Sequence, residues 1–262
     1  MKILQLSINL FIAAVTSLCF DCWLGLVGNT EVIDTTEQQP RPQQQKKSDR
    51  ADKLDFSGDG RPGRRTGGGS RNPCPISQIP LTALVPANNT GATVSDRPRF
   101  WFYVPYASRQ AATGEFVLQD RQENDLYRQA FNLPQTPGMV ALKLPPNAPP
   151  LAVDRSYHWY FKLYCGDSAS ATANFVEGWI TRIPLESDLA TRLKQGKNPA
   201  YKVYSNNLIW FDALDSLAQL RLNKDNPQLV REWNELLNAE GVNLGNLTQK
   251  PLMGAIDTSQ DN

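Results

Sequence analysis

A single histidine restricts the chemistry that this chain of 262 residues can perform. Because His158 stands alone, Ser-His-Asp and Cys-His catalytic sets and zinc sites with several histidines are not expected. A hydrolase that uses two carboxylates is the alternative. The acids considered for that role are Glu115, Asp120, Asp154, Asp167 and Glu177. No spacing brings two of them together, so we predict no catalytic residues, no metal site and no cofactor.

Two of the four cysteines are placed for a structural bond. Cys74 and Cys165 lie about 90 residues apart, whereas Cys19 and Cys22 lie in an apolar N-terminal segment. A metal pair would lack further ligands, and a redox couple normally uses C-x-x-C spacing. We therefore predict a Cys74–Cys165 disulfide, which stabilises by up to about 4–5 kcal/mol on the chain-entropy account of so long a loop.

Aromatic side chains gather in two segments, residues 100–103 and 157–164. Both segments alternate with the period of a β-strand, so half of their side chains must lie in a core. The other half could form a face that binds a protein or a glycan, or could lie beneath C-terminal helices. The residues of this predicted face are Trp101, Tyr103, His158, Tyr160 and Tyr164.

Arginines set among glycines form a second candidate site. Arg61, Arg64, Arg65 and Arg71 follow one another with no acid after Asp59. Such a segment could bind phosphate, lipid headgroups or an acidic polymer, or it could be a solvated tether, which is the interpretation that we favour. The formal net charge of +1 argues against strong steering towards nucleic acid, so no nucleic-acid partner is expected.

Residues 1–28 are expected to export the chain. One lysine precedes an apolar run from Ile3 to Phe20, which is typical of a signal peptide or a signal anchor. We therefore predict an extracytoplasmic protein in the periplasm or cell envelope. Contact with the membrane is expected only if this segment stays uncleaved and anchors the chain in the inner membrane. Residues 29–72 are rich in Gln, Arg and Gly, and they predict a disordered linker.

Residues 73–184 predict a β-domain. Turn-rich segments separate seven expected strands, the fourth of which could also be a helix: 79–85, 99–104, 115–119, 125–133, 138–144, 151–165 and 174–183. This count is typical of an Ig-like or fibronectin-like antiparallel β-sandwich, with a small barrel as the alternative. Leu151, six residues before Tyr157, also resembles the tyrosine corner of such sandwiches, in which the hydroxyl bonds back to the backbone.

The hydrophobic period changes after Pro184 to that of helices. Residues 185–245 predict a helical segment, and its clearest helix, residues 208–222, carries an apolar stripe. Asn226 and Pro227 are suited to begin the last helix. The sequence thus predicts a mainly β fold with a C-terminal α appendage, followed by a flexible tail at 246–262.

Six motifs in residues 61–245 form a recognisable set: GRRTGGGSRNPC, LTALVP, RFWFYVPY, YHWYFKLYC, GWITRIP and IWFDALDSLAQL. Together they resemble an uncharacterised family, domain of unknown function 928, seen in cyanobacteria. The resemblance implies an exported cyanobacterial protein with a linker, a sandwich and helices, and it carries no activity, cofactor or catalytic residue. The helical segment is also similar to one tetratricopeptide unit, which would need a neighbour on which to stack.

Together these features predict a non-catalytic cell-envelope protein that binds a protein or a glycan. The absence of a catalytic set beside a surplus of aromatic side chains favours this function. The alternative is a cell-wall-directed hydrolase or transferase that uses paired carboxylates.

Overall fold

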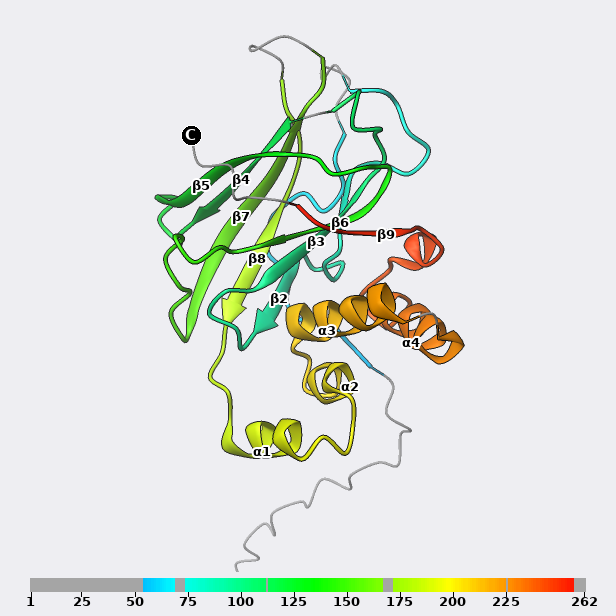
Figure 1. Ribbon diagram of the computed structural model, residues 1–262. Helices are drawn as coiled ribbons and strands as arrows, with labels where there is room; N and C mark the ends of the chain where they lie inside the picture. The colour runs from blue at the N-terminus through cyan, green and yellow to red at the C-terminus, as the bar shows by residue number, and fades with distance from the viewer. Residues whose placement is uncertain (1–53, 69–73, 112, 167–171, 225, 257–262) are drawn as a thin grey trace, which may run out of the picture. The chain divides into compact units, whose positions relative to one another are not determined.

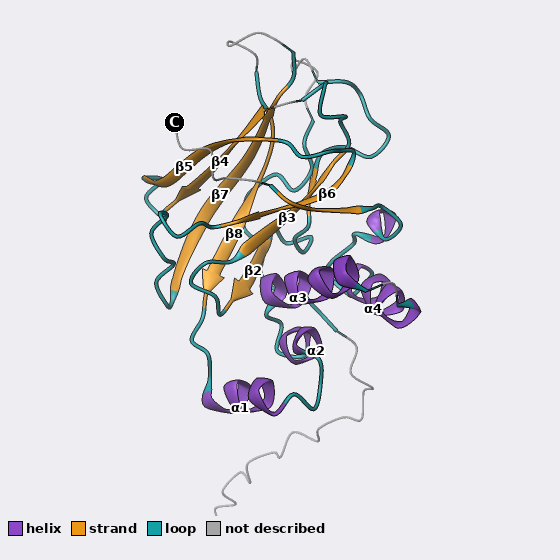
Figure 2. Ribbon diagram, viewed as in Figure 1, coloured by secondary structure: helices purple, strands orange, loops and turns teal. Residues whose placement is uncertain are grey.

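Two β-sheets and four α-helices make up the part of the chain that the computed structural model describes (Figure 1). The described residues are 54–68, 74–111, 113–166, 172–224 and 226–256. The predicted export segment, residues 1–28, lies outside them, as do residues 29–53 of the predicted linker. The fold is mainly β, as predicted, with its helices in the C-terminal part of the chain (Figure 2).

The first sheet has five strands in the order β2-β8-β7-β4-β5. Their bounds are Thr90–Thr93 for β2, Asn174–Arg182 for β8, Arg155–Tyr164 for β7, Thr113–Gln119 for β4 and Asp125–Asn132 for β5. The strand β7 is the longest, with alternating buried and half-buried residues from Trp159 onward. This is the alternation that its sequence predicts.

The second sheet has four strands in the order β1-β3-β6-β9. Their bounds are Thr82–Ala83 for β1, Arg99–Val104 for β3, Gly138–Lys143 for β6 and Leu252–Ala255 for β9. Aromatic rings join the two sheets into a sandwich. Phe102 of β3 stacks on Phe161 of β7 with 3.9 Å between ring centroids, and Phe100 lies 5.0 Å from Phe116 of β4. The two sheets are separate, so the barrel alternative is wrong.

The expectation of purely antiparallel pairing, as in an Ig-like sandwich, is also wrong. The strand β2 runs parallel to β8, and β9 runs parallel to β6. Each parallel pair joins strands that are far apart in the chain, so the intervening elements supply the long crossover that parallel pairing needs. The edge strand β2 was missed because its sequence, Thr-Gly-Ala-Thr, resembles a turn.

Two local predictions about β7 are confirmed. The Tyr157 hydroxyl accepts a hydrogen bond from the Ala152 backbone N–H at 2.7 Å, which closes the loop before the strand. Cys74 and Cys165 form a disulfide, with 5.0 Å between their Cα atoms. Such a bond is compatible with an extracytoplasmic location.

The helices follow β8, as α1 (Ser187–Gln195), α2 (Ala200–Ser205), α3 (Trp210–Asn223) and α4 (Pro227–Leu237), before the short 3₁₀ helix Gly245–Leu247. The apolar stripe of α3 is buried against β2, β3 and β9. Asn226 caps α4, because its side chain accepts a hydrogen bond from the Gln228 N–H at 2.8 Å. Among the described residues, no helix combines the length and apolar character that a membrane span requires.

Two segments that were expected to be disordered have defined structure. Residues 54–68 of the predicted linker lie on the sandwich, where Phe56 packs edge-on against Trp210 with 5.0 Å between ring centroids. In the predicted tail, β9 pairs with β6, and Ile256 is buried. A few apolar residues anchor each segment to the fold. The polar residues around them led to the prediction of disorder.

Candidate functional site

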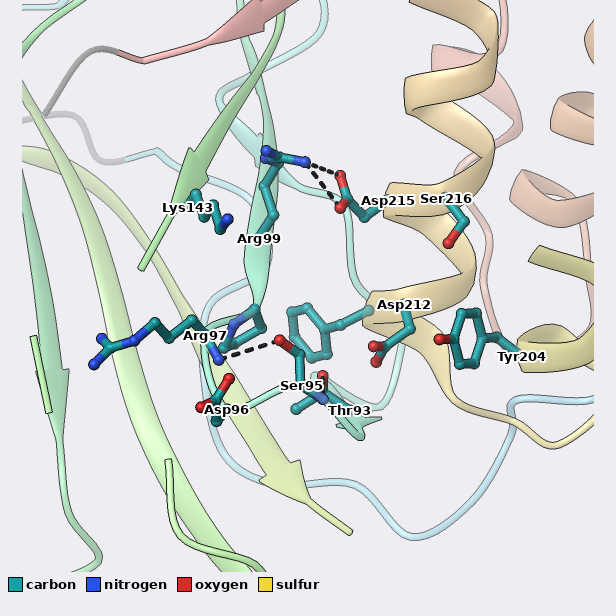
Figure 3. A pocket seen from close by; sticks show the side chains of 12 residues that line it. Thr93, Ser95, Asp96, Arg97, Arg99, Lys143, Tyr204, Asp212, Asp215 and Ser216 are labelled. Atoms are coloured by element: carbon teal, nitrogen blue, oxygen red, sulfur yellow. Dashed lines mark hydrogen bonds and ion pairs between the residues drawn. The ribbon is translucent and has the colours of Figure 1, made fainter. Parts of the chain in front are cut away.

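A cleft of about 350 Å³ opens between the start of β3, the end of β6 and the helices α2 and α3 (Figure 3). Its lining is polar and balanced in charge. Three basic and three acidic residues line it: Arg97, Arg99, Lys143, Asp96, Asp212 and Asp215. The cleft therefore presents hydrogen-bond donors and acceptors together.

The loop between β2 and β3 supplies one wall of the cleft. Its shape comes from two consecutive side-chain turns: the Thr93 hydroxyl accepts from the Ser95 N–H at 3.0 Å, and the Ser95 hydroxyl accepts from the Arg97 N–H at 3.1 Å. The Arg97 guanidinium also donates to the carbonyls of Pro145 and Ala148. Arg97 is therefore a fixed part of the wall.

The helix α3 supplies the opposite wall with two carboxylates. Asp212 and Asp215 are three residues apart, so they share one side of the helix. Asp215 accepts hydrogen bonds from Arg99 Nη1 at 2.9 Å to each of its oxygens and from Trp101 Nε1 at 3.1 Å. This carboxylate fastens the helix to β3 and holds Arg99 in place.

Asp212 is the most deeply buried ionisable group of the cleft. Its Oδ2 accepts a hydrogen bond from the Val94 N–H at 3.1 Å. Burial raises the pKa of Asp212 to about 6, although the Thr93 hydroxyl and the Val94 N–H partly oppose the shift. The Tyr204 hydroxyl points towards Asp212 in Figure 3. Burial and the neighbouring Asp212 charge raise the pKa of Tyr204.

Two charged groups of the cleft are free to bind a ligand. Within the described part of the chain, neither the Lys143 ammonium nor the Asp96 carboxylate forms a hydrogen bond or an ion pair through its side chain, and both residues are exposed. The Lys143 ammonium can only donate hydrogen bonds, and the Asp96 carboxylate accepts them. A ligand with several hydroxyl groups can bond to both kinds of group.

The predicted aromatic face is divided between the two sheets. Trp101 and Tyr103 lie on β3 and are buried, and the Lys250 ammonium lies 5.8 Å from the centre of the Tyr103 ring. His158, Tyr160 and Tyr164 lie on β7 of the other sheet. The helix α3 covers Trp101 through Asp215, Lys250 covers Tyr103, and the three residues of β7 form a separate surface.

His158 lies inside a stack of side chains on the outer side of β7. Its ring is parallel to that of Trp179, with 4.3 Å between centroids, and its Nε2 lies 2.9 Å from Glu177 Oε2. The Tyr160 hydroxyl lies 3.3 Å from His158 Nδ1. Burial lowers the pKa of His158, and Glu177 opposes that shift. Burial and the Glu177 charge raise the pKa of Tyr160 to about 12.

The predicted anion-binding arginines lie against the same sheet or inside the fold. The guanidinium carbon of Arg61 lies 4.7 Å from the centre of the Trp179 ring, and that of Arg64 lies 4.6 Å from the Phe175 ring. Arg65 has a structural role, because it donates to three backbone carbonyls: those of Val85, Val242 and Asn243. Arg71 lies outside the described residues.

The acids considered for a hydrolase do not meet in one cavity. Glu115 pairs with Lys162 at 2.9 Å and Arg128 at 2.6 Å, while Glu177 pairs with His158. The remaining three are two turn residues, Asp120 and Asp154, and one that lies outside the described residues, Asp167. In the described ranges, no group of three or more His, Cys, Asp or Glu residues is placed to hold a metal ion.

The acids of the cleft were missed in the sequence. The signal that could have found them is the pair Asp212 and Asp215, three residues apart in an otherwise apolar helix that begins at Trp210. Charged residues on the inner side of a buried helix need partners. Arg99, at the start of the most aromatic predicted strand, is the partner of Asp215.

A comparison with known protein families gives one match. The model of the family described as Domain of Unknown Function (DUF928) matches residues 66–252. The matched segment contains the strands β1 to β8, the helices and every residue that lines the cleft, and it ends at the first residue of β9. A search of the curated proteins found no match to the chain.

Proposed function

The chain belongs to the DUF928 family, and on that premise we propose that it is a non-catalytic extracytoplasmic protein that binds a glycan of the cell envelope. The observation that carries this proposal is the charge-balanced cleft between β3, β6 and α3. The Cys74–Cys165 disulfide supports a place outside the cytoplasm. The apolar N-terminal sequence supports export by a signal peptide or anchor.

The charge balance of the cleft favours a neutral sugar. A strongly anionic ligand would approach Asp96 and Asp212, and a cationic one would approach Lys143 and Arg97. A hydroxyl group both donates and accepts, so a sugar can bond to the ammonium and to the carboxylates in one orientation. The nearly buried Phe211 forms the apolar floor of the cleft beneath these polar groups.

A hydrolase is the second candidate, because the pKa of Asp212, about 6, would keep a fraction of this carboxyl protonated near neutral pH. Its partner would be Asp215. Both oxygens of Asp215, however, accept hydrogen bonds from Arg99, and one also accepts from Trp101. Asp215 therefore serves the packing of α3, and binding without cleavage is the better match to the geometry.

Titration of the purified full-length protein with neutral oligosaccharides, followed by ligand-observed NMR and calorimetry, tests this function. We expect saturable binding that Asp96→Ala and Lys143→Met each weaken about tenfold, the effect of losing one hydrogen bond to a charged group. Lys194→Met, which removes an exposed lysine of α1, is the matched control and should bind as the wild type does.

Two results would count against the proposal. Binding that is unchanged in both cleft variants would place the ligand elsewhere. Chromatography of the sugar after incubation addresses catalysis, because shorter fragments that disappear with Asp212→Asn would establish the hydrolase instead.

A further inference from the structure

We propose that the outer face of the five-stranded sheet is a second binding site, which takes an extended polysaccharide that carries carboxylate groups. The site consists of Arg61 and Arg64, the rings of Trp179 and Phe175 beneath them, and the neighbouring strand β7. It does not depend on the cleft, which lies at the outer face of the other sheet.

Each of the two guanidinium groups is held at two points. Arg61 lies over Trp179 and donates from Nη2 to the Ser156 hydroxyl at 3.2 Å. Arg64 lies over Phe175 and donates from Nη1 to the Gly68 carbonyl at 3.1 Å. A guanidinium has five N–H donors in a planar fork. Most donors of each arginine therefore remain available for a carboxylate, which the fork binds in a bidentate manner.

The backbone that carries these arginines is also fixed to the sheet. The Arg64 carbonyl accepts a hydrogen bond from the Glu177 N–H at 2.8 Å, and the Pro62 carbonyl accepts one from Trp179 Nε1 at 3.0 Å. The Arg61 N–H donates to the Asn88 carbonyl at 3.0 Å. Because the arm is ordered before any ligand arrives, less conformational entropy is lost on binding.

Positive charge is in excess on this face. Glu115 pairs with Lys162 and Arg128, and Asp125 pairs with Arg128. Glu177 lies on β8 between Phe175 and Trp179, and its neighbour His158, at 2.9 Å, offsets its charge only when the imidazole is protonated. In the described part of the chain, neither Arg61 nor Arg64 has a carboxylate partner at ion-pair distance. These side chains carry four positive charges against three negative ones, so the face favours an anion.

The spacing of the two arginines favours an extended ligand. Phe175 and Trp179 are four residues apart on β8, which separates them by about 13 Å along a strand. A single phosphate or lipid headgroup cannot reach both, whereas a polymer can. Beside them, the half-buried rings of Tyr160 and Tyr164 lie on the same side of β7 and can contact the faces of sugar rings. These rings favour an acidic polysaccharide among the polyanions.

Calorimetry of the full-length protein with an oligogalacturonate, and with a neutral oligosaccharide of equal length, tests the inference. We expect the acidic oligomer alone to bind at this face, with an affinity that falls as salt rises. Arg61→Gln with Arg64→Gln should weaken binding about tenfold or more, because two charge-assisted contacts are lost. Arg61→Lys with Arg64→Lys should restore only part of the affinity, since an ammonium lacks the fork.

The control is Arg155→Gln, which removes an exposed arginine of the same sheet and should leave the affinity unchanged. Equal affinity of the double Gln variant and the wild type overturns the proposal. So does the absence of binding to the acidic oligomer. Binding that is found only with vesicles of anionic lipid or with single-stranded DNA overturns the assignment of a polysaccharide. Circular dichroism of each variant verifies the fold.

Discussion

The outer face of each sheet carries a strand rich in aromatic residues, and a different segment of the chain packs over each face. On β3, Trp101 and Tyr103 are both buried, Trp101 beneath α3 and Tyr103 beside Lys250. On β7, Tyr160 and Tyr164 point outward, and both stay half-buried. The neighbouring strand β8 is covered in part by a short arm of arginines and glycines, residues 61–68. One cover is a packed helix, and the other is an extended chain.

The difference shows that the segment packed on a sheet face decides whether that face stabilises the protein or can bind a ligand. The helix α3 buries Trp101 almost completely, at 2% exposure, and satisfies its indole N–H with Asp215. That face therefore stabilises the protein, and the cleft opens beside it at the first turns of α3. The arm touches its sheet through two cation–π contacts and a few hydrogen bonds, and it leaves the rings of Tyr160 and Tyr164 beside it half-exposed.

The largest expected effect separates the two faces by stability. Trp101→Ala should lower the free energy of unfolding by about 3–5 kcal/mol, because it leaves a large cavity under α3 and removes one hydrogen bond to Asp215. Trp179→Ala should lower it by only about 1 kcal/mol, since it removes one half-buried ring with its cation–π contact and one hydrogen bond. Urea denaturation followed by circular dichroism measures both.

Equal losses for the two tryptophans would contradict the comparison, because they would make the arm as important to packing as the helix. Phe211→Leu is a useful reference, since it changes the buried helix side without opening a cavity of indole size. Its loss should fall between those of the two tryptophan variants.

The next effect concerns the carboxyl of Asp212, at the cleft. Its pKa is raised from 3.8 to about 6 by burial, so the folded protein binds this proton more tightly than the unfolded chain does. The stability that this proton provides is complete below about pH 4 and is lost as pH rises through 6, by up to about 3 kcal/mol. Asp212→Asn should therefore raise the midpoint of thermal unfolding at pH 8 and give no gain at pH 4.

Asp215→Asn is the contrasting variant, because Asp215 is ion-paired with Arg99 at 2.9 Å. It should lower the unfolding midpoint at pH 8. If both substitutions raised the unfolding midpoint at pH 8, Asp212 and Asp215 would share one environment. That result would contradict the assignment of Asp212 to binding and Asp215 to packing.

The sequence predicts well what alternation controls. The strand at 99–104 and the outward and inward sides of β7 follow directly from the period of two, and the tyrosine corner follows from local spacing. The disulfide follows from the small number of cysteines outside the N-terminal segment. The pairing of distant segments could not be predicted in this way. The parallel contacts of β2 with β8 and of β9 with β6 depend on how the whole chain folds, and neither short strand has a strong pattern of its own.

The candidate site shows the same limit. Arg61, Arg64 and the residues of β7 were recognised by their types, but their arrangement was not, because the contact between the arm and β8 joins segments over 100 residues apart. The cleft was missed altogether. In the sequence, Asp212 is only one polar residue of a predicted helix. Tertiary packing buries its carboxyl and turns it towards the loop that holds Thr93.

A smaller effect tests the attachment of the arm. A Cβ at Gly63 would lie 1.7 Å from Asn89 Nδ2, whereas a Cβ at Gly68 would meet no atom within 4 Å. Gly63→Ala should therefore displace the arm, lower the free energy of unfolding by about 1 kcal/mol, and speed limited proteolysis near residue 63. Gly68→Ala is the matched control and should digest as the wild type does. Equal digestion of both variants would mean that the arm is not seated by close approach at Gly63.

The smallest effect is a titration that relates the two faces. Burial favours the neutral form of an ionisable group on either face. It therefore raises the pKa of Asp212 at the cleft and lowers the pKa of His158 beside Trp179. Because the chain has one histidine, a single imidazole NMR signal reports its titration. We expect a midpoint below the usual 6.5, and a still lower one in Glu177→Gln, since the Glu177 charge favours the imidazolium.

The same shift has a consequence for stability. The folded protein binds the His158 proton less tightly than the unfolded chain does, so stability falls as pH drops below about 6.5. Asp212 acts in the opposite sense, with stability lost as pH rises through 6. Stability in His158→Gln should accordingly decline less on the acid side, and the wild-type decline should persist in Asp212→Asn. A His158 midpoint above 6.5 would mean that the imidazole stacked on Trp179 is open to water. It would contradict the burial of this part of the face by the arm.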